Sequence, residues 1–379
     1  MSAKVINSSN VNAYMSAGTE VASALRTGSL VIFPTETVYG IAANAADAEA
    51  MRRLREAKVC QDSKPFTVHL GRRAEAARYV RSAGALPRRL ARKVWPGPLT
   101  LVVEESAPEE TDIAQHCPPG QLGEIYNDGQ VGLRCPDHDV AQRLLNEARV
   151  PIVASSANRH GQPPPLDLET ALLEVGSHAD FAIDAGPTRF NTASTVVEVH
   201  GDSWRIRRSG VIDERTISRL ARSMILFVCT GNSCRSPMAE YIYRHKLAER
   251  LGHTPAELAA AGYEVASAGA FALAGGQASQ GALDEMARRE IDIRAHRSQP
   301  LTVELIQQAE RIYVMSAEHR SVVLNLVPGA AGNLELLDPQ GPVADPIGGG
   351  SEEYRHCAAH IERLLEARLK EFLDEDLNW

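Results

Sequence analysis

Residues 228–240, VCTGNSCRSPMAE, decide the arrangement of the second half of the chain. They follow the apolar run MILFV and lead into SPMAEYIYRHKLAERLG, a pattern typical of a helix. A strand, a short polar turn and a helix put Cys229 where the strand ends and Ser236 where the helix begins. The loop between them then points its backbone N–H groups inward. The pattern therefore predicts a site for a dianion at a helix N-terminus.

The side chains of this loop predict nucleophilic chemistry on a phosphate. Arg235 offers a planar fork that can hold two phosphate oxygens. The same positive field favours the thiolate form of Cys229, and the hydroxyl of Ser236 is placed to donate a hydrogen bond to it. A thiolate inside a phosphate cradle can attack phosphorus and form a phosphocysteine intermediate.

Such a reaction needs a general acid for the leaving group and then a base for water. Asp345 precedes a proline in the glycine-rich stretch VADPIGGGSEEY, which we expect to form a loop at the carboxyl edge of the sheet. Most Asp-Pro pairs only make turns or cap helices. With the Cys/Arg loop in the same domain, we favour the acid and base role for Asp345.

Composition sets the outer limits. The chain has 379 residues, 44% of them hydrophobic and 23% charged, with a net charge of −8, which predicts two or more globular domains and argues against non-specific nucleic-acid binding. We expect a cytoplasmic protein with no membrane contact, since no apolar run approaches the ~20 residues that span a bilayer. The six cysteines are scattered, so we predict no metal site and no structural disulfide.

The order of predicted elements divides the chain. Short β-like runs such as SLVIF (29–33), LTLVVE (99–104) and STVVEVH (194–200) alternate with helical patterns before residue 211, which predicts a mixed α/β sheet. The polar segment 107–130 is expected to be a long surface loop. After Met224, strands and helices alternate as in a doubly wound parallel sheet of four strands. The predicted domains are 1–215 and 224–379, with 216–223 as a linker.

CTGNSCRSPMAE, together with SAG (267–269), AHRS (295–298) and the late Asp-Pro, resembles the low-molecular-weight protein tyrosine phosphatases over residues 224 to about 374. The resemblance implies Cys229 as nucleophile, Arg235 as the ligand of the phosphate and transition state, and Asp345 as acid and base. It also implies that Asn232 braces the loop and that Ser236 activates the thiol. The phosphate loop would comprise Thr230, Gly231, Asn232, Ser233, Cys234 and Ser236, and the substrate would be a phosphorylated protein.

Two relatives of that family share the loop. Arsenate reductases of this fold need two further cysteines after the third strand, and RIYVMSAEHRSVVLNLVP has none, which disfavours that activity. Protein-arginine phosphatases resemble the loop with threonine where Ser233 stands, and no aromatic residue directly follows the Asp-Pro here. We therefore favour phosphoarginine or broad specificity over phosphotyrosine alone. Cys234 is either a small buried thiol or, as the resemblance implies, a partner that traps oxidised Cys229 as a disulfide.

The first half carries an ordered series of motifs. In turn they are FPTETVYGIAANA, LREAK, KPFTVHL, WPGPLTLVV, VGLRCPDH, VASSANRHG, DAG, STVVEV and RRSG. Taken singly, PTETVYG and SSAN are turn and cap patterns. The series resembles the threonylcarbamoyl-AMP synthases, the YrdC-type domain, from about residue 18 to 215.

That resemblance implies condensation of L-threonine, bicarbonate and ATP, with Mg²⁺ as the companion of the nucleotide rather than a tightly bound cofactor. The product serves threonylcarbamoyladenosine modification of tRNA, so the transfer machinery is an implied partner. Lys58, Arg134, Ser156, Asn158 and Arg208 would hold the nucleotide, and Thr35 and His69 would line the threonine side. Without the resemblance, the apolar run FTVHL favours a core histidine at His69.

One departure from the family pattern concerns Cys60. The family has lysine, any residue, arginine, whereas this chain has Lys58, Val59 and Cys60. Loss of one charge-assisted phosphate contact costs about 1.5–3 kcal/mol. Lys64 or a nearby arginine is a candidate substitute. We favour active synthesis, with a non-catalytic nucleotide- or RNA-binding domain as the alternative.

Overall fold

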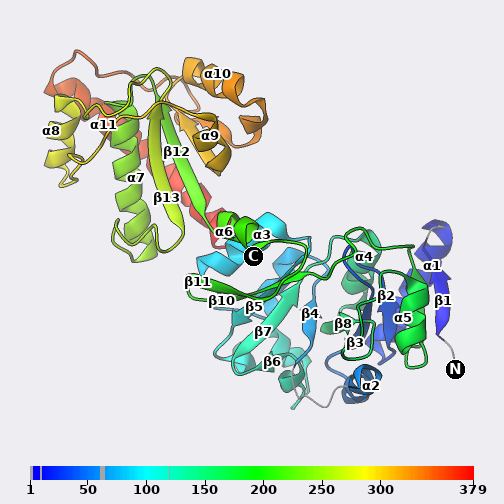
Figure 1. Cartoon of the computed structure of the whole chain (residues 1–379). Coiled ribbons are helices and arrows are strands. Elements are labelled where there is room, and N and C mark those ends of the chain that lie inside the picture. The colour runs from blue at the N-terminus through cyan, green and yellow to red at the C-terminus, as the bar shows by residue number, and fades with distance from the viewer. Residues whose placement is uncertain (1–2, 9–10, 60–64, 119) are drawn as a thin grey trace. The chain divides into compact units, whose positions relative to one another are not determined.

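The computed structural model describes residues 3–8, 11–59, 65–118 and 120–379, without the side chains of residues 11–16. The chain forms two compact units (Figure 1). The first comprises Met1–Leu220 and also Asp376–Trp379, and the second comprises Ala221–Glu375. Residues 216–223, predicted from the sequence as a linker, hold most of a helix and the first residue of a strand. The last four residues fall in the first unit rather than in the domain predicted for them.

The first unit is built on one large mixed sheet. Its strands are β1 (Lys4–Asn7), β2 (Val31–Phe33), β3 (Gly40–Asn44), β4 (Thr67–His69), β5 (Leu99–Glu104), β6 (Tyr126–Asn127), β7 (Gln130–Arg134), β8 (Ile152–Ser156), β9 (Phe181–Asp184), β10 (Thr195–His200) and β11 (Ser203–Arg208). The described strands pair in the order β1-β9-β2-β3-β8-β4-β7-β5-β10-β11, with β6 beside β7. Strands far apart in the chain therefore become neighbours: β8 lies between β3 and β4.

The helices of this unit are α1 (Val11–Arg26), α2 (Ala48–Lys58), α3 (Ala85–Val94), α4 (Asp139–Ala148), α5 (Leu168–Val175) and α6 (Glu214–Leu220). Val21 and Leu25 of α1 and Leu144 of α4 pack on Val31 and Phe33 of β2 in one apolar core. Such complete burial of large side chains contributes roughly 1.5–3 kcal/mol each. This packing holds the middle strands rigid beneath the site described below.

Segment 107–130 is more ordered than the surface loop that its polar composition predicts. It contains short 3₁₀ helices at Pro108–Glu110, Asp112–His116 and Gln121–Glu124, followed by β6. Ile113 and Ile125 are fully buried. Two isolated apolar anchors therefore tie down a segment whose average composition is polar.

The C-terminal residues complete the first unit. Asp376 and Arg89 of α3 are both fully buried and form a two-point ion pair, with Nη2–Oδ2 at 2.9 Å and Nε–Oδ1 at 3.2 Å. Arg92 donates to the same carboxylate at 3.0 Å. The ring of Trp379 stacks on Trp95, with centroids 6.2 Å apart. Because these charges are removed from water, they depend on each other.

The second unit is a doubly wound sheet. Its described strands, β12 (Ser223–Cys229), β13 (Tyr263–Gly269), β14 (Arg311–Val314) and β15 (Leu334–Leu336), are all parallel in the order β13-β12-β14-β15. The helices are α7 (Arg235–Leu251), α8 (Gln280–Arg288), α9 (Val303–Gln308), α10 (Ala317–Leu326) and α11 (Ser351–Asp376), with a 3₁₀ turn at Pro328–Gly332.

Alternation along β12 explains why both faces of this sheet are covered. Leu226 and Val228 pack in one core with Ile306 of α9 and Val323 of α10. Phe227 points to the other face, where its ring lies 5.5 Å from that of Tyr243 of α7. Every residue of β12 is buried, which is the pattern of a central parallel strand. Its carboxyl end delivers Cys229 to the edge of the sheet.

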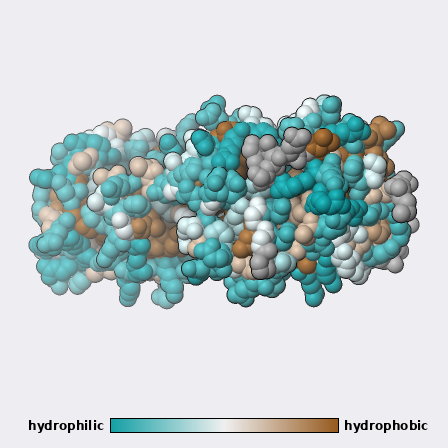
Figure 2. Space-filling view, turned by 90° about the horizontal axis from the view of Figure 1, so that it is seen from below, coloured by the Kyte–Doolittle hydropathy of each residue, from teal (hydrophilic) through white to brown (hydrophobic). Residues whose placement is uncertain are grey.

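The outer surface is mainly polar on the face seen in Figure 2, where apolar residues lie in small separated groups. Among the described residues, no helix has the length and apolarity needed to cross a bilayer.

Candidate functional sites

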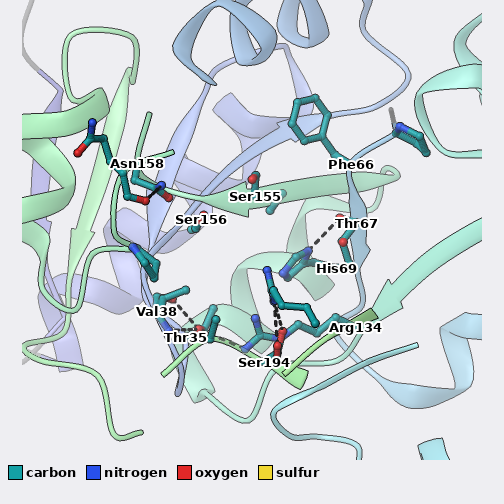
Figure 3. A pocket seen from close by; sticks show the side chains of 17 residues that line it. Thr35, Val38, Phe66, Thr67, His69, Arg134, Ser155, Ser156, Asn158 and Ser194 are labelled. Carbon is teal, nitrogen blue, oxygen red and sulfur yellow. Dashed lines mark hydrogen bonds between the residues drawn. The ribbon is translucent and has the colours of Figure 1, made fainter. Parts of the chain in front are cut away.

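A cavity of about 420 Å³ lies over the middle strands of the first unit (Figure 3). Its walls come from five distant parts of the chain: the turn after β2, the region of β4, the end of β7, the end of β8 with the turn that follows it, and the start of β10 with the end of β11. Of the residues predicted for this site, Thr35, His69, Arg134, Ser156, Asn158 and Arg208 line the cavity. The fold thus gathers residues that are up to 173 positions apart in the sequence, from 35 to 208.

Arg134 is a firmly anchored cation of this cavity. It is 5% exposed, and its Nη2 donates to Glu36 Oε1 at 3.0 Å and to Thr35 Oγ1 at 3.4 Å. Glu36 is itself 2% exposed and accepts from the backbone N–H of Asp137 at 3.1 Å. The Nε of Arg134 is buried without a hydrogen-bond partner among the described residues. A donor left unpaired in a buried place is a feature of a site that awaits an acceptor.

Arg208 is the second cation on the cavity wall. Its Nη2 donates to the carbonyl and hydroxyl oxygens of Ser194, at 2.9 and 3.1 Å. Burial, and then the nearby charge of Arg134, lower the pKa of Arg208 below its usual value. No carboxylate lines the cavity in the part of the chain that the structure describes. Two guanidiniums that repel one another across such a cavity form a place suited to an anion.

His69 faces the same cavity as a neutral imidazole. Its Nδ1 lies 3.0 Å from the carbonyl oxygen of Thr67 (Figure 3), and because a carbonyl can only accept, this nitrogen carries the proton. Burial, together with the charge of Arg134, lowers the pKa of His69 to about 3. Its Nε2 is therefore an acceptor near neutral pH.

Lys58 differs from the role implied for it. It does not line the cavity; its Nζ donates to the backbone carbonyl oxygens of Ser156, at 2.6 Å, and Asn158. It thus holds from behind the turn that presents Ser156 and Asn158. Cys60 and Lys64 lie outside the described residues, so the departure from the family pattern at Cys60 stays a matter for experiment.

The phosphate-loop candidate of the second unit runs from the end of β12 to the start of α7. Cys229 is 2% exposed, and its Sγ lies 2.9 Å from the Oγ of Ser236. Asn232 Nδ2 donates to that same Oγ at 3.0 Å, so the single hydroxyl proton of Ser236 is left for one of two acceptors: the sulfur, at 2.9 Å, or the carbonyl oxygen of Ala268, at 3.5 Å.

Asn232 stabilises the conformation of the phosphate loop through its backbone and its side chain. It has a positive φ of 54°, which asparagine tolerates better than most residues. Its Nδ2 also donates to Ser267 Oγ at 2.7 Å, and its Oδ1 accepts from the backbone N–H of Gln299 at 2.9 Å. The ring of His296 lies 2.8 Å from its carbonyl oxygen. Contacts from β13 and from the segment after α8 thus fix the side chain and the carbonyl group of Asn232.

Gly269 at the end of β13 makes room for the loop. A Cβ at this position would come within 2.7 Å of the carbonyl oxygen of Thr230 and 2.9 Å of the nitrogen of Asn232. These are backbone atoms of the loop itself and have little freedom to move. The glycine of SAG is therefore a packing requirement of the phosphate loop.

Arg235 is 6% exposed at the first position of α7. Its Nη1 donates to the carbonyl of Val343 at 3.1 Å and its Nη2 to Thr230 Oγ1 at 3.2 Å; Nη2 also pairs with the carboxylate of Asp345. Its Nε is buried, and no described residue accepts a hydrogen bond from it. The structure thus joins Arg235 directly to Asp345, although 110 residues separate them in sequence.

Cys234 has contacts that the sequence does not predict. Its Sγ lies 3.2 Å from Ser279 Oγ at the N-cap of α8 and 3.3 Å from the hydroxyl of Tyr354 on α11. The thiols of Cys229 and Cys234 are both free. Ser233 accepts from the N–H of Ser279 at 2.9 Å through its carbonyl, so the loop is also tied to α8.

Sequence reasoning missed several residues around both sites. Glu36 lies within the motif PTETVYG, but the sequence does not show that it is buried beside Arg134, and this contact is what identifies its role. Ser194 and Phe66 also line the first cavity, and His319 contacts the phosphate loop, 2.9 Å from Thr230 Oγ1. A lone histidine in a helical segment carries no local signal of such a contact.

Comparison with known proteins accounts for both units. Residues 23–210 match a family model for Sua5, YciO and YrdC proteins described as telomere recombination, and residues 224–378 match one for low molecular weight phosphotyrosine protein phosphatase. A Mycobacterium tuberculosis protein named “Putative threonylcarbamoyl-AMP synthase” is 38% identical over 199 residues, 52% of this chain and 85% of that protein. The Bacillus subtilis threonylcarbamoyl-AMP synthase is 32% identical over 52% of this chain and 54% of its own length.

Among solved structures, the YwlE arginine phosphatase from Geobacillus stearothermophilus is 33% identical over 41% of this chain and 96% of its own, with a TM-score of 0.36. A variant of Sua5 from P. abyssi is 23% identical, covers 88% of this chain and 98% of its own, and has a TM-score of 0.50, a similarity of fold alone.

Proposed function

Since the chain belongs to the Sua5, YciO and YrdC family through its first unit and to the low molecular weight phosphotyrosine protein phosphatase family through its second, we propose a bifunctional enzyme. The first unit condenses L-threonine, bicarbonate and ATP into threonylcarbamoyl-AMP and pyrophosphate. The second hydrolyses phosphorylated protein through a phosphocysteine.

The observation that carries the phosphatase proposal is the 2.9 Å contact between Ser236 Oγ and Cys229 Sγ inside a loop that also presents Arg235. In the first step an Sγ–P bond forms while the P–O or P–N bond to the leaving group breaks. Asp345 gives its proton to that leaving group. In the second step water attacks the phosphocysteine, passes a proton to Asp345, and inorganic phosphate leaves with the thiolate restored.

Arg235 and Asp345 must separate for this reaction to proceed. The carboxylate of Asp345 pairs with Nη2 of the guanidinium at the edge of the loop. A phosphate dianion is a stronger partner for that fork. We expect substrate to displace Asp345, whose side chain is 36% exposed, toward the leaving group. Away from the guanidinium the carboxylate can take up a proton from water, and it gives this proton to the leaving group.

We propose phosphoarginine as the better substrate of this site. Ser233 is small and polar, and the residue after Asp345-Pro346 is Ile347, which is 67% exposed and followed by three glycines. A phenol ring therefore finds no aromatic partner in that loop. The backbone N–H of Phe271, which follows β13 and is 72% exposed, donates to the carbonyl of Thr230 at 2.9 Å, so one exposed aromatic residue does neighbour the phosphate loop. The preference for phosphoarginine therefore rests on Ser233 and on the loop after Pro346.

Kinetics on matched phosphoarginine and phosphotyrosine peptides test both statements. The expected result is a higher kcat/KM for phosphoarginine, and a loss of about 1,000-fold or more for both peptides in Cys229→Ser. A Cys229→Ser variant that keeps wild-type turnover contradicts the mechanism. A preference for phosphotyrosine contradicts only the substrate assignment.

For the first unit, the supporting observation is the pair of cations, Arg134 and Arg208, beside a neutral His69 in one cavity. We propose that the guanidiniums hold the anionic groups of the nucleotide and the carboxylate of threonine. Lys58 supports the turn at Ser156 and Asn158 rather than the phosphates. Thr35, whose hydroxyl donates to the carbonyl of Val38 at 2.6 Å, forms part of the threonine side.

The residues that line this cavity do not fit a protein-held Mg²⁺. As far as the structure describes it, the cavity wall contains hydroxyls, amides and guanidiniums but no carboxylate. Within the described part of the chain, no cluster of three or more His, Cys, Asp or Glu side chains could hold a metal. Because Mg²⁺ prefers carboxylate oxygens and phosphates, these residues offer the ion no site, and no step is assigned to it.

Pyrophosphate release from ATP with threonine and bicarbonate tests this unit. Release by the wild type that falls in Arg134→Lys supports the synthase. No release by the wild type, together with release by Cys60→Arg, supports a nucleotide-binding domain that has lost catalysis. Delivery of the product to the tRNA-modification machinery follows only if release is observed.

A further inference from the structure

A chain of hydrogen bonds runs from the phosphate loop into the first turn of α10. Thr230 Oγ1 lies 2.9 Å from Nε2 of His319, and Nδ1 of that ring lies 3.0 Å from Ser316 Oγ. Ser316 Oγ in turn donates to Glu318 Oε2 at 2.7 Å. At the other end, Thr230 Oγ1 accepts from Nη2 of Arg235 at 3.2 Å. His319 is therefore one hydroxyl away from the guanidinium assigned to the phosphate.

The donors and acceptors at the two ends fix the protons between them. Arg235 can only donate, so Thr230 Oγ1 accepts from it and has its own proton left for His319 Nε2. Glu318 can only accept while ionised, so Ser316 gives its proton to it and accepts from His319 Nδ1. The ring then carries one proton, on Nδ1, and along the chain from Arg235 to Glu318 each donor meets an acceptor.

Charges around the ring favour the same neutral state. His319 is 4% exposed. The charged groups that act on it are Arg235 at the start of α7, Asp345 in the loop before α11, and Glu318 on its own helix. Burial, and next the charge of Arg235, lower the pKa of His319 below its usual value. A protonated ring would place a second cation on the hydroxyl that already holds Arg235.

We propose that His319 is a positioning residue: as a neutral ring it accepts the proton of Thr230, and so fixes the threonine oxygen that orients the guanidinium of Arg235. This rests on the proposed phosphatase function. It adds to that function a residue outside the loop, on a helix of its own. It also adds a pH limit. Once the ring is protonated, its Nε2 becomes a donor and no longer accepts the proton of Thr230. The Thr230 oxygen is then no longer fixed, and the guanidinium of Arg235 is no longer oriented toward the phosphate.

Glutamine and asparagine separate this role from simple packing. The amide oxygen of His319→Gln can reach the place of Nε2 and accept from Thr230, without titrating. The shorter amide of His319→Asn reaches only the place of Nδ1. We expect His319→Gln to keep kcat/KM on a phosphopeptide within about 3-fold at pH 7.5, and His319→Asn to lose about 10-fold or more, mainly in kcat.

Two further measurements complete the test. Wild-type kcat/KM should fall with a histidine-like limb below pH 6.5, and that limb should be absent in His319→Gln. Thr230→Val should lose as much activity as His319→Asn, and the double variant no more than either, because both remove one bond. His253→Gln, beyond the far end of α7, serves as the matched control and should behave as wild type. Equal losses in the Gln and Asn variants, or additive losses in the double variant, overturn the proposal.

A readout that needs no turnover keeps this inference separate from the proposed function. In ¹⁵N-histidine protein of full length, the ring of His319, identified by its loss in His319→Gln, should show a proton on Nδ1 and none on Nε2 at pH 7. A ring protonated on Nε2 at that pH contradicts the inference even in an active phosphatase. An Nδ1-protonated ring in a protein without phosphatase activity leaves the hydrogen-bond assignment standing and refutes the function.

Discussion

Arg235 and Arg134 are two buried guanidiniums whose Nε has no partner among the described residues, and the candidate anion site of each unit contains one of them. Arg235 lies in a loop of eight consecutive residues, Cys229 to Ser236, at the start of a helix. Arg134 ends a strand and meets Thr35, Glu36 and Thr37, which follow another strand almost 100 positions earlier in the chain. The first arrangement is local and can be recognised in the sequence as a motif. The second exists only once the sheet is assembled.

The carboxylates beside the two arginines differ as well. Asp345 is partly exposed and lies on a loop, so it can leave Arg235. Glu36 is buried, with its side chain only 1% exposed, and holds Arg134 from behind. The first carboxylate is therefore suited to proton transfer and the second to positioning. Each of the following predictions tests one side of this contrast.

The largest effect is expected from Arg235→Lys. A lysine cannot reach Val343, Thr230 and the phosphate together, since its ammonium is a single point. We expect kcat/KM on phosphopeptides to fall by about 100- to 1,000-fold, with pyrophosphate release unchanged. Arg250→Lys, on the exposed end of the same helix, is the control and should keep wild-type activity. Equal activity of the two variants would mean that a point charge suffices.

Glu36→Gln should destabilise the first unit by about 3 kcal/mol, because it leaves Arg134 buried without a counter-charge. Trp95, Trp204 and Trp379, the three tryptophans of the chain, all belong to this unit, so tryptophan fluorescence during urea unfolding reports on it selectively. Glu56→Gln, an exposed residue of α2, should leave the transition in place. An unchanged midpoint for Glu36→Gln would assign Arg134 another counter-ion.

Gly269→Ala tests whether the phosphate loop of the second unit depends on close packing against β13. The added methyl group meets backbone of the phosphate loop, which must shift by several tenths of an ångström. We expect a loss of between about 10- and 100-fold in phosphopeptide kcat/KM, at little cost in overall folding. Gly329→Ala, where a Cβ meets no described atom within 4 Å, is the control. Full activity of Gly269→Ala would show that the loop adapts.

The smallest effect concerns pH and His69. Its pKa is about 3 in the folded unit and about 6.5 when unfolded, so the unfolded chain binds more protons between these values. Stability of the first unit should therefore fall as pH drops below 6.5, by about 2 kcal/mol at pH 5 from this residue. His69→Asn, whose amide can still donate to Thr67, should remove that increment, and exposed His160→Asn should not. Parallel pH curves for wild type and His69→Asn would place the titration elsewhere.

Sequence patterns predict those parts of the fold in which a strand, a turn and a helix follow one another along the chain. Apolar runs such as MILFV, followed by polar turns and helices, indicate the parallel sheet of the second unit. Strand β3 escaped prediction because GIAAN is short and follows a motif interpreted as a turn. The anchors Ile113 and Ile125 escaped because a single buried side chain does not alter the composition of a polar segment.

The same division applies to the sites. Cys229, Arg235 and Ser236 share one motif, and Asp345 was favoured from its Asp-Pro position in the same predicted domain, a role that the resemblance also implies. Lys58 was assigned to the nucleotide because the family resemblance implies that role, whereas its ammonium donates to backbone carbonyls at 156 and 158. Glu36 and His319 act through partners roughly 100 residues away in the chain. Only tertiary contacts could identify them.

The ion pair between Arg89 and Asp376 implies that a shortened chain containing only residues 1–220 is less stable than the first unit of the whole protein. A shortened chain that stops at residue 220, where the main segment of the first unit ends, retains the guanidinium and discards its carboxylate. Such a fragment lacks the carboxylate that pairs with the buried Arg89 and the ring that stacks on Trp95. Adding residues 376–379 back as a synthetic peptide should then raise its melting temperature. We therefore expect a tag fused to the carboxyl terminus to change the stability of the first unit more than that of the second.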